Sequence, residues 1–235
     1  SSCAEAHAVL GFVAIDGMRM KQGMAEYRHA LSLDPNSATA HQWYGISLLL
    51  DGKPTQAYDQ LREAADLNPE SVAAADWLSQ AAFIARRYKD AIAYGRQALD
   101  LSPARYGVYS TLGMAYEALG DYPAAIASYK KYAATCTYCS FDAAALLAHV
   151  YAITHDDVRA QEQLKRAERG IALRKAPLDD VAVALAAMGR KDDAMAMLRK
   201  ATHEEPGAAG FLAVDPRMDA LRGDARFRQV TQGPG

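Results

Sequence analysis

Apolar residues recur every three to four positions in two consecutive stretches between residues 38 and 69. This spacing places apolar side chains on one face of a helix. The positions are Tyr44, Ile46 and Leu48 in the first stretch and Ala57, Leu61 and Ala64 in the second. Between them stand Gly52, a residue type that ends helices, and Pro54, which is tolerated at a helix start. The pattern therefore predicts a helical hairpin that closes at Asn68-Pro69.

The hairpin repeats along the chain with a spacing of 34 residues. One hairpin cannot bury both of its faces, so it needs neighbours. The positions that share the spacing are Pro35, Pro69 and Pro103; Ala57, Ala91 and Ala125; and Ala30, Ala64 and Ala98. This period resembles that of the tetratricopeptide (TPR) repeat family. The resemblance implies an all-α fold, a right-handed TPR α-solenoid of helical hairpins with C-terminal capping helices.

The repeats predict one elongated domain, because each repeat contacts only its neighbours. We expect six TPR-like hairpins over residues 4–206 and a capping segment with a tail over residues 207–235. Two features depart from the family pattern. The third repeat has Ser79 and Gly95 at family positions, and one extra residue after the fourth repeat shifts the register of the fifth.

The segment 211–230 is not a repeat and reads FLAVDPRMDALRGDARFRQV. Its apolar positions can cover the last repeat, which predicts a C-terminal cap. The sequence around Asp215-Pro216-Arg217 also resembles the end of the TPR region in bacterial winged-helix regulators of the CadC type. Met218, Ala220 and Ala225 replace family residues there. Related endings occur in some bacterial kinases and cyclases. The resemblance implies that a DNA-binding or catalytic domain belongs N-terminal to this region.

The resemblance also implies a binding surface, because the first helices of TPR hairpins line an inner groove. The side chains expected there are Gln42, Trp43, Ile46, Leu49, Asp76, Trp77, Gln80, Phe83, Ser110, Met114, Glu117 and His149. Trp43 and Trp77 share one slot at the edge of this face and have a competing interpretation as wedges between repeats. Such a groove suits a peptide, a protein segment or a small organic ligand. It lacks the cluster of Lys and Arg that would clamp an acidic peptide.

Cys136 and Cys139 form a CxxC at a helix–helix junction. Three interpretations are open: a local disulfide at a junction that lacks the repeat's closing proline, two inert thiols, or a redox or metal site. The last has little support, because no βαβ context and no second ligand pair accompany the motif. No histidine has a partner at the spacing of a metal site, so we expect no metal and no cofactor.

Composition and the absence of known motifs argue against several function classes. The net charge is −2, the isoelectric point is about 6.3, and no basic stretch predicts nucleic-acid binding. No apolar run approaches the roughly 18 residues that span a membrane. No catalytic sequence motif is present, so we expect no enzymatic activity. The start at Ser-Ser-Cys and an apolar first helix (Val9, Leu10, Phe12, Val13) are typical of a piece of a longer protein.

These observations favour a signal- or partner-binding region of a bacterial transcriptional regulator, in which groove occupancy or the pairing of two such domains changes the state of the array. The alternatives are a general TPR protein–protein interaction scaffold, such as an assembly factor or lipoprotein, and a regulatory region of a kinase or cyclase. Both the periplasmic side of a membrane-anchored protein and the cytoplasm are compatible with the sequence.

Overall fold

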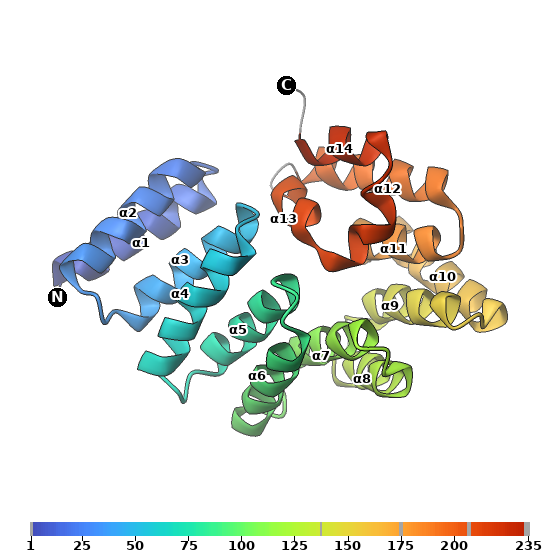
Figure 1. The fold of residues 1–235 in the computed structure, drawn as a ribbon, viewed down its shortest axis with the longest axis horizontal. Helices are drawn as coiled ribbons and strands as arrows, with labels where there is room; N and C mark the ends of the chain where they lie inside the picture. Colours follow the sequence, from blue (N-terminus) through green and yellow to red (C-terminus); the bar gives the residue numbers. More distant parts are fainter. Residues whose placement is uncertain (1, 137, 174–175, 206–207, 233–235) are drawn as a thin grey trace. The chain divides into compact units, whose positions relative to one another are not determined.

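A computed structural model describes residues 2–136, 138–173, 176–205 and 208–232. Within these ranges the chain is helical and has no strand (Figure 1). The paired helices are α1 (Ser2–Asp16), α2 (Met20–Leu33), α3 (Ala38–Leu50), α4 (Pro54–Leu67), α5 (Val72–Ile84), α6 (Tyr88–Leu101), α7 (Gly107–Ala118), α8 (Tyr122–Thr135), α9 (Ser140–Ile153), α10 (Asp157–Ala172), α11 (Leu178–Ala187) and α12 (Lys191–Glu204). The C-terminal helices are α13 (Ala208–Val214), the 3₁₀-helix η1 (Pro216–Leu221) and α14 (Ala225–Gln232). In the described residues no helix is both long and apolar enough to cross a membrane.

The helices pair into hairpins in two compact units, Ser1–Ser102 and Pro103–Gly235. In the first unit, α1 packs on α2, α3 on α4, and α5 on α6. In the second, α7 packs on α8, α9 on α10, and α11 on α12. Consecutive first helices also touch within each unit, as α1, α3 and α5 do in one and α7, α9 and α11 in the other. Each unit therefore has a row of first helices.

The 34-residue period is visible in the backbone, because each first helix ends in a residue with positive φ. These residues are Met18, Gly52, Arg86, Gly120, His155 and Gly189. Their spacing is 34 residues except between Gly120 and His155, where it is 35, which confirms the expected extra residue. In each turn the next N–H donates back to a carbonyl five residues earlier, as from Lys53 to Leu48 at 2.8 Å. This is the Schellman closure of a helix end, which glycine adopts without steric cost.

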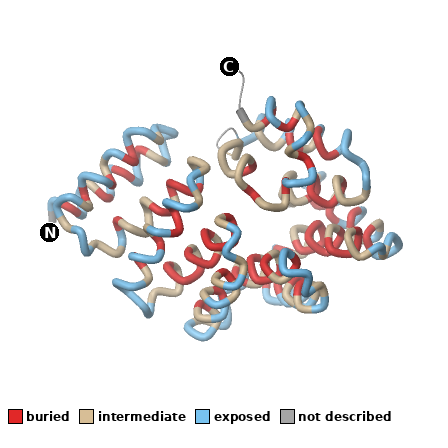
Figure 2. The backbone as a smooth tube through the Cα atoms, in the orientation of Figure 1, coloured by how far each residue is buried: buried red, intermediate tan, exposed pale blue. Residues whose placement is uncertain are grey.

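Small residues let the two helices of a hairpin approach closely. The alanines of the predicted packing positions are almost fully buried, as red segments along each hairpin in Figure 2 illustrate. A Cβ added at Gly11 would lie 2.6 Å from Cε1 of Tyr27, and one added at Gly113 would overlap the ring of Tyr129. Where the third repeat has Ser79 instead of glycine, its hydroxyl donates to the carbonyl of Ala91 in the second helix at 2.8 Å. The departure from the repeat pattern is therefore accommodated by a hydrogen bond.

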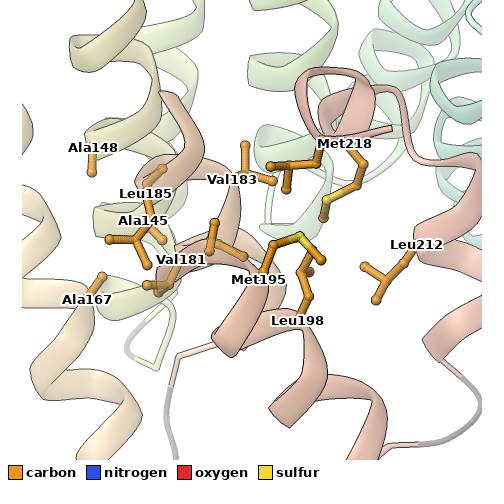
Figure 3. Close-up of a cluster of buried hydrophobic side chains, with 14 of the residues drawn as sticks. Ala145, Ala148, Ala167, Val181, Val183, Leu185, Met195, Leu198, Leu212 and Met218 are labelled. Atoms are coloured by element: carbon orange, nitrogen blue, oxygen red, sulfur yellow. The ribbon is translucent and has the colours of Figure 1, made fainter. Parts of the chain in front are cut away.

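The C-terminal helices pack on the last hairpin. Helix η1 contacts α11, while α13 and α14 contact α12. The tail contributes five buried side chains to one apolar cluster with α11 and α12; they are Leu212, Met218, Leu221, Phe227 and Val230. Figure 3 shows Leu212 and Met218 beside Met195 and Leu198 of α12. Burial of five such side chains contributes on the order of 8–15 kcal/mol before entropic costs, so this segment is an integral part of the second unit.

Candidate partner-binding surface

In the first unit, the contacting helices α3 and α5 both carry partly exposed side chains on the row of first helices. Helix α3 presents Gln42, Trp43 and Ile46, and α5 presents Trp77 and Gln80; all five are partly accessible. They combine two indoles, an aliphatic side chain and two amides. The 34-residue spacing puts Ile46 and Gln80 in equivalent slots of consecutive first helices. This arrangement provides apolar contact area with a few hydrogen-bonding groups, which is the composition of a peptide-binding surface.

Three of the side chains predicted for this surface are buried instead. Leu49, Asp76 and Phe83 are each about 2% exposed, so they do not present a surface to a partner. Phe83 packs against the ring of Tyr88 with a centroid separation of 5.8 Å. Asp76 accepts a hydrogen bond from the amide of Gln80 at 3.3 Å. The structure therefore places these three predicted residues in the interior of the first unit.

Trp43 serves the packing between repeats as well as the surface. Its ring lies 5.2 Å from the ring of Phe12 in α1, centroid to centroid, and it packs on the alanine cluster Ala8, Ala30 and Ala40. These contacts match the wedge interpretation of its slot. Trp43 is nevertheless partly exposed, so part of its surface remains open to a ligand. Trp77, in the same slot of α5, is also half-buried.

In the second unit, two of the predicted residues form a polar pair. Nδ1 of His149 on α9 lies 2.8 Å from a carboxylate oxygen of Glu117 on α7. The hydroxyl of Tyr129 on α8 donates to the other oxygen of that carboxylate at 3.2 Å. Glu117 is 9% exposed, and its carboxylate is held between α7, α8 and α9. The register of the repeats could have indicated this pair, since His149 lies one repeat plus the extra residue beyond Met114, on the same face as Glu117.

The other two predicted residues of this unit have local partners. The hydroxyl of Ser110 donates to the carbonyl of Gly107 in its own helix at 2.7 Å. Met114 packs at the edge of the apolar cluster that contains Tyr129 and Val150. Burial, together with the negative charge of Glu117, raises the pKa of Tyr129 well above its ordinary value, so this hydroxyl stays protonated and acts as a hydrogen-bond donor.

Sequence reasoning did not anticipate an ion-pair cluster around Arg217 of η1. Its guanidinium bonds to the buried carboxylate of Asp215 at 2.6 Å and to Asp180 in the first turn of α11. Burial raises the pKa of Asp180, although Arg217 opposes this effect. Burial alone lowers the pKa of Arg217, but Asp215 and Asp180 more than offset this and hold it above its ordinary value. The cluster fastens the tail to the last hairpin.

Within their described spans, the first helices of the hairpins carry no permanently cationic side chain. None of the six first helices of the hairpins contains Lys or Arg in the sequence of its described span. They do contain carboxylates, among them Glu117, Asp142, Asp179 and Asp180. Positive charge is instead carried by the second helices, the turns and the tail. A partner on the first helices of either unit would therefore meet no Lys or Arg from those helices.

The CxxC lies at the junction of α8 and α9. In the structure Cys136 and Cys139 are joined as a disulfide, with Cα atoms 5.2 Å apart, and both are buried against the cluster around Tyr132. The amide of Cys139 donates to the carbonyl of Cys136 at 3.2 Å, which closes a tight turn. Cys3 is exposed and unpaired. In the described part of the chain, no group of three or more His, Cys, Asp or Glu residues could hold a metal ion.

Comparison with known proteins places these helical hairpins in a repeat class. A tetratricopeptide repeat model matches residues 106–134. A model described as subunit 3 of the anaphase-promoting complex, or cyclosome, matches residues 20–98. The chain carries tetratricopeptide repeats. A search of curated proteins found no match to the sequence of this chain.

Solved structures share the TPR fold at low sequence identity. PilW, described as a widely conserved type IV pilus biogenesis factor, is 18% identical with a TM-score of 0.68, over 91% of this chain and 99% of that one. MamA is 21% identical with a TM-score of 0.61, over 70% of this chain and 95% of that one. YrrB, described as a TPR protein with an unusual peptide-binding site, is 17% identical with a TM-score of 0.57, over 81% and 89%. Similarity at this level establishes the fold alone.

Proposed function

We propose that the chain is a non-enzymatic interaction scaffold that binds a peptide segment of a partner protein on the first helices of its repeats. The observation that carries the proposal is the set of partly exposed side chains Trp43, Ile46, Trp77 and Gln80 on the neighbouring helices α3 and α5. The described peptide-binding site of YrrB, which has a similar fold, supports the choice of ligand class. Rigid paired helices suit such a role because they hold contact residues without an ordering cost on binding.

The charge of the first helices indicates what the peptide contains. With no Lys or Arg on them, an acidic peptide would find no cation to pair with. Apolar side chains have Trp77 and Ile46 to contact, and a basic side chain would meet no Lys or Arg of α3 or α5 to repel it. We therefore expect an apolar segment that is neutral or basic.

The transcription-regulator hypothesis rests on the tail resemblance, and the tail has a structural use of its own. Asp215 caps η1 by accepting the amide N–H of Arg217 at 2.9 Å, and Arg217 pairs with Asp180. The Asp-Pro-Arg sequence is thus accounted for by capping and docking of the tail. A scaffold role requires no further domain, so we favour it over a regulatory one.

Binding can be tested with short synthetic peptides in which Leu and Phe alternate with Arg, against matched peptides that carry Glu in place of Arg. The two tryptophans of the chain both lie on α3 and α5, so intrinsic fluorescence reports on this surface directly. We expect the Arg peptides to shift the emission and the Glu peptides to leave it unchanged. Equal binding of both peptide sets would contradict the charge argument.

A pair of matched variants localises the site. Ile46→Arg places a cation in the middle of the proposed surface, and we expect it to weaken peptide binding at least about tenfold. Val158→Arg makes the same kind of change at a residue of α10 that is 81% exposed and distant in sequence, and affinity should stay as in the wild type. If both variants bind as the wild type does, the peptide does not use α3 and α5.

A further inference from the structure

The second helices of the second unit carry pairs of consecutive cations at one position of the repeat. The pairs follow the repeat spacing, including the extra residue before the fifth repeat, and they are Lys130-Lys131 in α8, Lys165-Arg166 in α10 and Arg199-Lys200 in α12. All six side chains are exposed. Because the chain as a whole has a net charge of −2, these positive charges are a local concentration on three helices.

Each pair points away from the interior of the unit. The residue before each pair is buried, since Tyr129, Leu164 and Leu198 are at most 1% exposed. The residue after the pairs of α8 and α10 is buried too, namely Tyr132 and Ala167. Consecutive residues lie about 100° apart around a helix, so two positions between such buried neighbours lie on the opposite side. The six cations of three consecutive hairpins therefore form one basic face.

Local structural roles do not account for these cations. Favourable interaction with a helix dipole is confined to the last turn, and all three pairs lie before it. Among the described residues, Lys200 is the one member of the six that has an ion-pair partner, Glu204 at 3.9 Å. Helix α8 contains no Asp or Glu in its span. The basic face is thus available to an external anion.

Exposed apolar side chains lie at the edge of the basic face. Arg169 follows Lys165 by one helical turn and extends the face, and Leu173, which is 58% exposed, follows Arg169 by one more turn. Tyr138, which is 79% exposed, has the corresponding place after α8, because it precedes Leu173 by one repeat of 35 residues. Cations beside exposed apolar side chains are typical of surfaces that lie on an anionic bilayer.

Two other anionic partners suit this face less well. Four of the six cations are lysines, and Lys is depleted at protein–protein interfaces. Single-stranded nucleic acids are bound by cations together with aromatic rings on which bases stack, and α10 and α12 contain no Phe, Tyr or Trp. A lipid surface attracts clustered Lys and Arg through its surface potential and requires no fixed pairing of side chains.

We propose that the basic face of α8, α10 and α12 binds the surface of a membrane that contains anionic lipids. The lysines and arginines lie against the headgroups, and Leu173 and Tyr138 contact the boundary between headgroups and acyl chains. Each cation near such a surface contributes about a fivefold gain in affinity, and salt weakens the attraction. The binding uses other residues than the peptide surface on α3 and α5 and does not depend on it.

Co-sedimentation of the full 235-residue chain with lipid vesicles tests the proposal. We expect the chain to bind phosphatidylcholine vesicles that contain about 30% phosphatidylserine and to be released at high salt. Vesicles of phosphatidylcholine alone should leave it in solution. Lys130→Glu combined with Lys131→Glu should lower the affinity at least about 25-fold. Lys165→Glu combined with Arg166→Glu should have the same effect, which separates loss of the basic face from a local defect in α8.

A matched control distinguishes the basic face from net charge. Lys21→Glu combined with Lys89→Glu reverses two exposed cations of the first unit and should bind the vesicles as the wild type does. Equal weakening in this control would overturn the proposal, and so would a wild-type chain that ignores anionic vesicles at low salt. A short RNA and a polyglutamate peptide are tested in parallel. Binding of either one through Lys130 and Lys131, with the vesicles left unbound, would contradict a membrane as the partner.

Discussion

At the scale of single residues, the C-terminal segment repeats one arrangement, in which an aspartate binds the arginine two positions later. Asp215 accepts the amide of Arg217 and a fork of guanidinium hydrogen bonds, and Asp224 does the same for Arg226. Each arginine then reaches an aspartate of the last hairpin. The two copies differ in burial, since Arg217 is 10% exposed and Arg226 is 41% exposed. Ion pairs in these two environments have different energetic value.

Because the two arginines differ in burial, replacing each by alanine should lower the free energy of unfolding by different amounts. Arg217→Ala leaves Asp215, which is fully buried, without its cation and should lower the free energy of unfolding by about 3 kcal/mol. Arg226→Ala removes an exposed ion pair that solvent screens, and it should cost clearly less stability than Arg217→Ala. Urea denaturation followed by circular dichroism measures both. Similar losses in the two variants would mean that burial does not set the value of these pairs.

At the scale of helices, the sequence predicts the fold closely and the surface partly. The hairpins, their period and the extra residue before His155 follow from spacing, because helix packing calls for small or apolar residues at regularly spaced buried positions. Accessibility of the inner-face residues does not follow in the same way. Leu49 is buried although Ile46, one turn earlier in α3, is partly exposed, and Phe83 is buried although Gln80, one turn earlier in α5, is partly exposed. Phe83 is covered by the ring of Tyr88 in α6, a contact that the spacing of apolar residues does not encode.

The pairing of Glu117 with His149 was missed for a related reason. Both residues were expected on the inner face, but a contact between side chains on different hairpins depends on rotamers and on the third partner, Tyr129. The Arg217 cluster was missed because Asp179-Asp180 is also what a helix start with no distant partner would show. The repeat pattern therefore does not predict side-chain contacts between elements that are distant in sequence.

Close helix approach gives a prediction at this scale. Gly113→Ala gains helix propensity of about 1 kcal/mol but forces a methyl group into the buried ring of Tyr129, so the variant should be destabilised by about 1–2 kcal/mol overall. Gly107→Ala in the same helix meets no atom within 4 Å and should be neutral or slightly stabilised. Thermal unfolding of both variants should show a lowered midpoint for Gly113→Ala and an unchanged or slightly raised midpoint for Gly107→Ala. A stabilised Gly113→Ala would show that α7 and α8 can move apart freely.

At the scale of the whole molecule, stability is expected to be local. In a repeat array each hairpin is stabilised by its own helices and its nearest neighbours, so a perturbation should fade along the chain. The division into two compact units, residues 1–102 and 103–235, is consistent with this expectation. The tail belongs energetically to the second unit, because its apolar side chains are buried with those of α11 and α12.

Two cavity-forming substitutions test this locality. Leu221→Ala in η1 and Leu61→Ala in α4 remove side chains that are at most 1% exposed, and each should cost about 2–5 kcal/mol where it acts. Hydrogen exchange measured by mass spectrometry should show lost protection in α11, α12 and the tail for Leu221→Ala, with α3 to α5 unchanged. Leu61→Ala should give the reverse pattern, which makes each variant the control for the other. Loss of protection along the entire chain in both variants would mean that the array unfolds as one cooperative unit, and the nearest-neighbour account of its stability would fail.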